Sequence, residues 1–213
     1  MSKPILIMGA TSGIGQCAVN EALSRNLPVR AFARSAADME PATGLEPYPG
    51  DALDHQDVAG ALKGARAVIH ALGIRERPAM LWQEETLFSK STGILLQEMN
   101  TAGVSRLLAV TGIGAGRSKS ALSFIERAAH KAVFRKPYED KDRQEEMIIQ
   151  SDTDWTIVRP VILTNGAKSG KYRVLRKPEE WRMGLISRND VASYLIDAIE
   201  ADSDVKSDVV LAN

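Results

Sequence analysis

The chain has 213 residues, of which 44% are hydrophobic, and its 27 Lys and Arg residues balance its 27 Asp and Glu residues. This length and composition suffice for one well-filled hydrophobic core, and the balanced charge lacks the basic excess typical of nucleic-acid-binding proteins. Cys17 has no disulfide partner, the three histidines lack metal-ligand spacing, and no apolar stretch has membrane-spanning length, so we expect a cytoplasmic protein without a metal, membrane or nucleic-acid partner.

Strand and helix patterns alternate along the chain. Short apolar runs predict strands at 5–8, 28–33, 46–48, 67–72, 106–111, 155–158 and 209–211. Helical spacing of apolar residues predicts helices at 14–24, 54–63, 81–101, 121–133, 139–149 and 189–200. The alternation predicts an α/β fold with a doubly wound parallel sheet and helices on both faces. No linker is evident, so we expect one domain over 1–213, with substrate-side elements within about 113–145 and 160–185.

A glycine-rich loop joins the first strand to the first helix. Its sequence, Gly-Ala-Thr-Ser-Gly-Ile-Gly, spaces the glycines as GxxxGxG inside a β-α-β unit. Glycines there allow a tight turn and close approach of a pyrophosphate to the helix N-terminus, so the loop predicts a Rossmann-type dinucleotide site. The candidate binding residues are Gly9, Thr11, Ser12, Gly13, Ile14 and Gly15. The alternative is a tight strand-to-helix turn that binds nothing.

The end of the second strand indicates which dinucleotide is bound. An NAD site usually places an acidic residue there for the ribose 2′-hydroxyl, whereas this chain has Arg34 and Ser35, with the first acid at Asp38. Arg34 would pair with a 2′-phosphate, so NADP(H) is expected in preference to NAD(H). The hydroxyls of Thr11 and Ser12 could also donate to phosphate. The alternative for Arg34 is a solvated strand end.

Motifs along nearly the whole chain resemble those of the short-chain dehydrogenase/reductase superfamily. Within it, the chain is similar to the atypical branch that includes NmrA-like NAD(P)-binding proteins and biliverdin/flavin reductases. The matching segments are 9–15, 34–35, 50–51, 71–73, 103–106, 111–112, 154–160 and 186–192. The resemblance implies the Rossmann-type fold already indicated by the glycine loop.

The resemblance also implies roles for residues after the third and fourth strands. Asp51 would accept a hydrogen bond from the adenine amino group, and Ala52 would cap the adenine ring. Ala71, Leu72 and Gly73 would run beneath the adenosine ribose. For Asp51, a role as a helix or turn cap is the alternative.

At the nicotinamide end, Thr111 would stand where the family places its active-site serine. Pro160, Val161 and Ile162 would supply backbone and apolar contacts to the nicotinamide. The alternatives are that Thr111 terminates its strand and that Pro160 only ends its own strand.

The catalytic pattern departs from that of many superfamily members, which carry Tyr-x-x-x-Lys on one helix. Lys141, four residues before Glu145, matches the family's lysine, but Pro137 fills the tyrosine slot and Tyr138 is displaced by one residue. We expect Pro137 to mark a helix start. Thr111, Tyr138 and Lys141 are the candidate catalytic residues, and the alternative for Tyr138 is a partly exposed aromatic residue at a helix N-terminus.

Basic residues are concentrated late in the chain. The stretch 164–182 carries six positive and two negative side chains, which would suit an anionic substrate if it lined the substrate side. A solvated surface hairpin is the favoured alternative. Arg75, Glu76 and Arg77 are weaker candidates for the same side.

These observations favour an NADP-dependent oxidoreductase that transfers hydride between the nicotinamide and a small carbonyl, quinone, flavin or enone-type acceptor. A non-catalytic NADP-binding redox sensor of the NmrA-like kind is the alternative, favoured by the displaced tyrosine and absent serine. An epimerase or dehydratase that uses bound NAD is disfavoured by Arg34 and the short substrate region. The expected partner is a small molecule, and the expected assembly is a monomer or homodimer.

Overall fold

The computed structural model of the chain describes residues 3–74 and 84–213, and for 124–134 it describes the backbone alone. Eight strands form one sheet in the order β3-β2-β1-β4-β5-β6-β10-β8, with β8 antiparallel and all other pairs parallel. The strands are β1 (Ile5–Met8), β2 (Val29–Ala33), β3 (Leu45–Pro49), β4 (Ala67–His70), β5 (Arg106–Val110), β6 (Asp154–Pro160), β8 (Arg173–Leu175) and β10 (Ser207–Ala212). The predicted α/β, Rossmann-type fold is confirmed.

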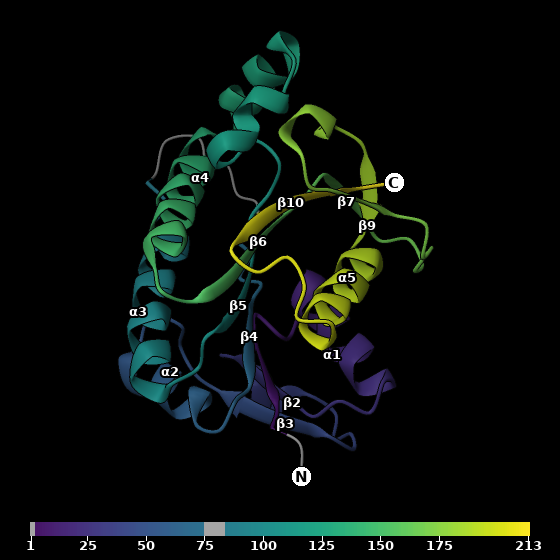
Figure 1. The fold of residues 1–213 in the computed structure, drawn as a ribbon. Helices are drawn as coiled ribbons and strands as arrows, with labels where there is room; N and C mark the ends of the chain where they lie inside the picture. Colours follow the sequence, from purple (N-terminus) through teal and green to yellow (C-terminus); the bar gives the residue numbers. More distant parts are fainter. Residues whose placement is uncertain (1–2, 75–83) are drawn as a thin grey trace.

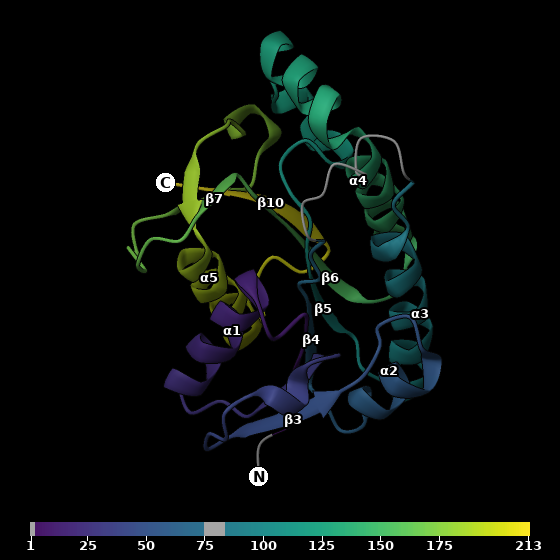
Figure 2. The ribbon, with the colours of Figure 1, turned by 180° about the vertical axis from the view of Figure 1, so that it is seen from behind.

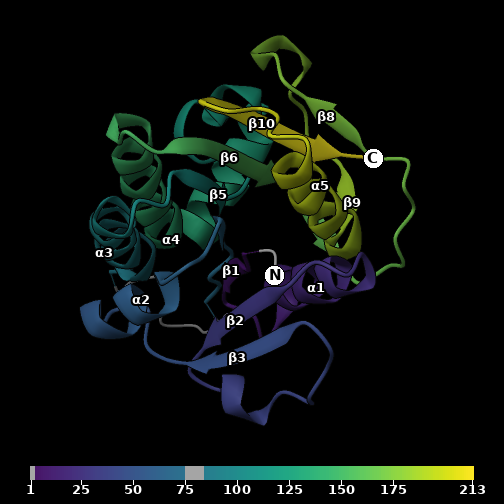
Figure 3. The same ribbon diagram turned by 60° about the horizontal axis from the view of Figure 1, so that its bottom comes forward.

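Helices cover both faces of the sheet (Figures 1 and 2). They are α1 (Gly13–Ser24), α2 (His55–Leu62), α3 (Leu87–Ala102), α4 (Phe124–Gln150) and α5 (Arg188–Glu200). The end view separates α1 and α5 on one side of the sheet from α2, α3 and α4 on the other (Figure 3). Successive side chains of β1 divide between these layers, because Ile5 and Ile7 join the core under α1 and α5 while Leu6 and Met8 join the core under the other three helices.

Local signals fix several helix ends. Asp54 caps α2, because its Oδ1 accepts hydrogen bonds from the backbone N–H groups of Gln56 and Asp57 at 2.8 and 3.0 Å. Gly103 ends α3 in the left-handed conformation, at φ 66°. Ser187 caps α5 by accepting from the backbone N–H of Asp190 at 3.0 Å. These caps mark the points at which α2 and α5 begin and α3 ends.

The prediction of two helices separated near Pro137 is wrong. A single helix, α4, runs through Pro137, so this proline does not mark a helix start. Proline keeps a helical φ, but it removes one N–H from the helix ladder and its ring crowds the carbonyl group one turn earlier, at a cost of about 3 kcal/mol. Packing of α4 against α3 and β6 offsets that cost. Consequently Tyr138 lies inside a helix, not at its N-terminus.

Three short strands lie in stretches for which the sequence predicted no strand. β8 adds an antiparallel edge beside β10. β7 (Ile162–Thr164) and β9 (Leu185–Ser187) form a separate two-stranded parallel sheet beyond β6. This small sheet lies next to the carboxyl end of β6, and β7 falls within the stretch 160–185 that we expect on the substrate side.

Candidate functional site

A cavity of about 1030 Å³ opens at the carboxyl ends of β1, β2, β4, β5 and β6. This is where doubly wound sheets bind ligands, beside the switch in strand order between β1 and β4. Most of the predicted site residues line the cavity: Gly9, Thr11, Ser12, Gly13, Ile14, Arg34, Ser35, Asp51, Ala52, Ala71, Leu72, Gly73, Thr111, Lys141 and Pro160. Three predicted cofactor residues, Gly15, Val161 and Ile162, and the candidate acid Tyr138 are not among its lining residues.

The glycine loop has the shape that a diphosphate requires. A Cβ on Gly9 would lie 2.6 Å from the carbonyl oxygen of Ala71, and one on Gly15 would lie 2.2 Å from that of Gly9, so both glycines permit close backbone packing. Gly13 differs, since it has φ +57° and open space around its Cβ position. The Ser12 side chain makes no cap to α1, so the helix N-terminus presents backbone N–H groups to that space. The residues present therefore fit a dinucleotide.

Polar side chains border the adenosine end of the cavity. The Ser35 hydroxyl donates a hydrogen bond to Thr11 Oγ1 at 3.1 Å. Arg34 is exposed, and it has no hydrogen bond or ion pair within the described residues. Asp51 Oδ1 accepts from the backbone N–H of Leu53 at 2.9 Å, while no described group donates to its Oδ2. The Asp51 carboxylate thus serves a turn and still offers an acceptor to the cavity.

At the opposite end of the cavity, α4 brings Lys141 to the carboxyl end of β5. Lys141 Nζ donates a hydrogen bond to the backbone carbonyl oxygen of Thr111 at 2.5 Å. Burial lowers the pKa of Lys141 to about 8, although the Glu145 carboxylate opposes this by favouring the ammonium. The Thr111 hydroxyl donates to Glu145 Oε1 at 2.7 Å. Lys141 therefore places a titratable amine at this end of the cavity.

The Tyr138 hydroxyl lies close to this group, although Tyr138 is not among the residues that line the cavity. A Cβ on Gly112 would lie 2.6 Å from the Tyr138 hydroxyl oxygen, so this glycine makes room for the tyrosine. Lys141 Nζ lies 5.5 Å from the centre of the Tyr138 ring. Burial, reinforced by the Glu145 carboxylate, raises the pKa of Tyr138 to about 12. Burial thus makes this hydroxyl a weak acid beneath the backbone of Gly112.

The comparisons with known proteins identify the family. A family model described as NAD(P)H-binding matches residues 9–202. The chain belongs to this NAD(P)H-binding family. The resemblance to atypical, reductase-like short-chain proteins is confirmed. The chain matches no curated protein sequence.

Solved structures share the fold over almost the whole chain. ChuY, an anaerobilin reductase from Escherichia coli O157:H7, is 27% identical with a TM-score of 0.80, covering 98% of this chain and 96% of its own. The oxidoreductase ylbE from Lactococcus lactis is 18% identical with a TM-score of 0.82, covering 99% and 90%. A short-chain dehydrogenase/reductase from Veillonella parvula, solved with NADP, is 14% identical with a TM-score of 0.83, covering 100% and 95%. Together with the family match, the reductase relative supports an NAD(P)-dependent oxidoreductase.

Several cavity residues of this NAD(P)H-binding protein were missed by sequence reasoning. They are Phe32, Ala33, Gly50, Leu53, Ile74, Glu85, Leu87, Val110, Leu163 and Arg188. Arg188 is the most informative, because it brings a second arginine to the cavity. Its Nη1 donates to Asn165 Oδ1 at 2.7 Å, which holds the side chain at the start of α5. The motif at 186–192 contained Arg188, but no spacing signal connected it to the glycine loop.

The basic stretch at 164–182 does not reach the cavity. Lys168 pairs with Glu21 at 2.6 Å, and Arg176 pairs with Asp204 at 2.6 Å. Arg173 donates to the carbonyl oxygen of Asn213 at 2.7 Å. None of the six basic residues of the stretch lines the cavity. Arg75, Glu76 and Arg77 lie outside the described residues.

Residues 3–74 and 84–213 contain neither a metal-binding cluster nor a membrane-spanning helix. No group of three or more His, Cys, Asp or Glu side chains there could hold a metal ion. In the same part of the chain, no helix combines the length and apolar character needed to cross a bilayer.

Proposed function

We propose that this protein is an NADPH-dependent reductase that transfers hydride to a small carbonyl, quinone, flavin or enone-type acceptor. One observation carries the proposal: a single cavity joins the glycine loop and Arg34 to the Lys141 ammonium group. The first part suits a phosphorylated dinucleotide, and the second supplies a proton donor where a reduced acceptor would need one.

The residues of the cavity can account for each charged part of NADPH. Arg34, with the hydroxyls of Ser35 and Thr11 beside it, would hold the 2′-phosphate. The N-terminus of α1 would bind the diphosphate. The glycine loop itself has no cation, so Arg188 would supply a full positive charge near that helix, and its field already reaches Cys17 on α1. Asp51 would accept from the adenine amino group.

When bound, NADPH supplies a hydride to the acceptor. Lys141 Nζ would donate a proton to the oxygen or nitrogen that becomes negatively charged as the acceptor is reduced. The resulting neutral amine regains a proton from solvent. The carbonyl of Thr111 holds the Lys141 amine in place throughout, because the backbone oxygen accepts one of its N–H groups. A cation held at this position would stabilise the negative charge that develops on the acceptor as it is reduced.

The likeness to ChuY, which is described as an anaerobilin reductase, supports a reductase. A second function remains in competition, namely an NADP-binding redox sensor. The observation that favours it is the commitment of the Thr111 hydroxyl proton to Glu145, together with the position of Tyr138 outside the cavity lining. The reductase and the sensor would use the same cofactor site, but only the reductase would oxidise NADPH in the presence of an acceptor.

Turnover separates them directly. Purified protein is incubated with NADPH and with a panel of quinones, flavins, aldehydes and enones, while the absorbance of reduced nicotinamide is followed. We expect oxidation of NADPH with at least one class of acceptor, and loss of that rate in Lys141→Met. NADPH binding without oxidation on any acceptor would contradict the reductase and favour the sensor.

A further inference from the structure

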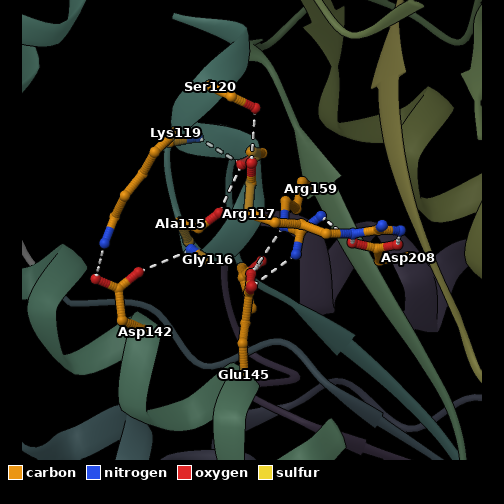
Figure 4. A network of polar contacts seen from close by, with 12 residues as sticks. Ala115, Gly116, Arg117, Lys119, Ser120, Asp142, Glu145, Arg159 and Asp208 are labelled. Carbon is orange, nitrogen blue, oxygen red and sulfur yellow. Dashed lines mark hydrogen bonds and ion pairs between the residues drawn. The ribbon is translucent and has the colours of Figure 1, made fainter. Parts of the chain in front are cut away.

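A chain of buried ionic contacts links Glu145, Arg159 and Asp208 (Figure 4). It begins at Thr111, whose hydroxyl donates to Glu145 Oε1 at 2.7 Å. Arg159 donates to both oxygens of the same carboxylate, from Nε at 2.9 Å and from Nη2 at 2.7 Å. Arg159 Nη1 then donates to Asp208 Oδ2 at 2.5 Å, and Arg117 pairs with Asp208 nearer the surface. The side chains of Glu145 and Arg159 are only 2% and 0% exposed.

Neighbouring groups enclose the Glu145 carboxylate. A Cβ on Gly116 would lie 2.0 Å from Glu145 Oε2, so the loop backbone rests against the carboxylate. The Arg159 and Arg117 guanidinium carbons lie 5.3 and 5.1 Å from the centre of the Trp181 ring. The carboxylate is thus fully surrounded, with a bidentate arginine on one side and Thr111 on the other. A group held in this way has one orientation.

This orientation decides what the Thr111 hydroxyl can do. A hydroxyl has one proton, and an ionised carboxylate only accepts, so Thr111 gives its proton to Glu145. Toward the cavity it can then only accept a hydrogen bond. The proton that a reduced acceptor needs would then come from another group, and Lys141 Nζ, bound to the carbonyl oxygen of the same Thr111, lies next to it.

Several titratable groups face Lys141 from the surrounding elements. From α4, the Glu145 carboxylate favours the ammonium, and Tyr138 is a weak acid with a raised pKa. From β4, His70 is neutral, since burial lowers its pKa to about 4. From β6, Arg159 is the cation that neutralises Glu145 in part. The cavity wall also carries the charged side chains of Glu85 and Arg188.

We propose that Glu145 is a positioning residue for the reduction: it turns the Thr111 hydroxyl proton away from the cavity and leaves Lys141 as the proton donor. The inference rests on the proposed reductase function. If Glu145 had a purely structural role, removing the carboxylate beside the cavity and removing the one at the far end, Asp208, would have the same effect on the pH profile of the reaction.

Two variants make that comparison. Glu145→Gln removes the charge next to Thr111, while Asp208→Asn removes the other carboxylate partner of Arg159 and leaves Thr111 untouched. In Glu145→Gln, we expect the alkaline limb of the kcat/KM profile to move to lower pH by about one unit, because the ammonium loses its stabilising carboxylate. In Asp208→Asn, the limb should stay at the wild-type pH. Equal shifts in the two variants would overturn the inference.

A second readout needs no substrate. The pH dependence of Lys141 acetylation by acetic anhydride, followed by peptide mass spectrometry, reports the pKa of Lys141 in the intact protein. We expect a lower pKa in Glu145→Gln than in Asp208→Asn, and an equal value would overturn the inference. Absence of wild-type turnover together with the expected shift would contradict the proposed reductase while confirming the influence of Glu145 on Lys141.

Thr111→Val keeps the test decisive if Glu145→Gln fails to fold. Valine has nearly the shape of threonine but lacks the hydroxyl, and Glu145 retains both contacts to Arg159. If Thr111 donates no proton to the acceptor, kcat should fall by less than about tenfold and the pH profile should keep its alkaline limb. A loss of more than about a hundredfold would identify the hydroxyl as the proton donor and overturn the inference.

Discussion

Asp140 on α4 caps the first turn of α3, because its Oδ2 accepts a hydrogen bond from the backbone N–H of Phe88 at 2.8 Å. The side chain of Asp140 is fully buried, and its other oxygen accepts from Arg143 Nη2 at 3.1 Å. Asp140 is adjacent to Lys141, whose Nζ lies 5.0 Å from the centre of the Phe88 ring. The cap therefore fixes α4 to α3 at the level where Lys141 enters the cavity.

Asp140→Ala should lower the free energy of unfolding by about 2 kcal/mol, since it leaves helix N–H groups of α3 buried without an acceptor. Chemical denaturation measures the change. Asp54→Ala is the matched control, because Asp54 caps α2 at a more exposed site away from Lys141. Both variants should lose stability, and Asp140→Ala should lose more because the N–H groups that it leaves without an acceptor are buried. Wild-type stability in Asp140→Ala would contradict the cap.

Lys141→Met should lower kcat by about a hundredfold or more, while NADPH affinity falls by less than about tenfold. Steady-state kinetics and calorimetric titration measure the two effects. Because burial lowers the pKa of Lys141 to about 8, the wild-type rate should decline as the pH rises through that value and the ammonium is lost. Tyr138→Phe should reduce kcat far less. A larger loss in Tyr138→Phe than in Lys141→Met would assign the proton to the tyrosine.

Arg34→Ala should weaken NADPH binding by about 1.5 to 3 kcal/mol and leave NADH binding nearly unchanged, because only NADPH carries the 2′-phosphate. Calorimetric titration with both cofactors gives the comparison. Arg182→Ala removes another exposed arginine that does not line the cavity, and it should affect neither affinity. Equal wild-type affinities for the two cofactors would be incompatible with the role given to Arg34.

Gly13→Val should abolish the rise in melting temperature that saturating NADPH produces, since the side chain would fill the space in front of the α1 N-terminus. Gly64→Val is the matched control. Gly64 also has a positive φ and open space around its Cβ position, but it lies away from the cavity. Both variants carry similar backbone strain. A full NADPH-induced shift in Gly13→Val would exclude the loop as the phosphate site.

His70 should make the protein less stable in mild acid. Its Nε2 contacts Ser91 Oγ at 3.1 Å and its Nδ1 contacts Gln144 Nε2 at 3.2 Å, and burial lowers its pKa from 6.5 to about 4. The unfolded chain therefore binds a proton that the folded chain excludes. The stability that the neutral ring provides is complete above pH 6.5 and is lost toward pH 4.

The resulting slope of unfolding free energy is at most about 1.4 kcal/mol per pH unit. Denaturation titrations between pH 5 and 6.5 measure it, where most carboxylates stay ionised. His70→Gln should flatten the slope, while His55→Gln, which replaces a half-exposed histidine, should retain it. An unchanged slope in His70→Gln would assign the acid sensitivity to other groups.

The strands at the centre of the sheet were predictable because each contains a run of apolar residues, as in β1 and β5, which are buried along their whole length. β7, β8 and β9 were not, since each has only three residues and is specified by its tertiary partner. Pro137 was misinterpreted for a related reason. Local sequence indicates that a proline destabilises a helix, whereas the packing of α4 on α3 and β6, which offsets that destabilisation, is visible only in the structure.

The candidate site also combines residues that the sequence predicts with residues that only the structure reveals. The glycine loop and Arg34 are local motifs, so they were found in the sequence, and the structure places them in one cavity. Glu145 was noted only as a spacing mark for Lys141, because its contact with Thr111 spans 34 positions. Arg188 is still further from the loop that it faces. Contacts between distant elements give these two residues their significance, and no periodicity encodes them.

The pairing of α1 with α5 has a consequence for synthesis of the chain on the ribosome. Arg25, at the end of α1, donates to Asp197 Oδ1 and Glu200 Oε2 at 2.6 and 2.8 Å, across a separation of up to 175 positions. During translation, α1 therefore emerges long before its helical partner exists. Until about residue 200 has left the exit tunnel, the buried face of α1 has no α5 to cover it. Shielding by a chaperone, or early binding of a dinucleotide to the α1 N-terminus, would protect the nascent chain during that interval.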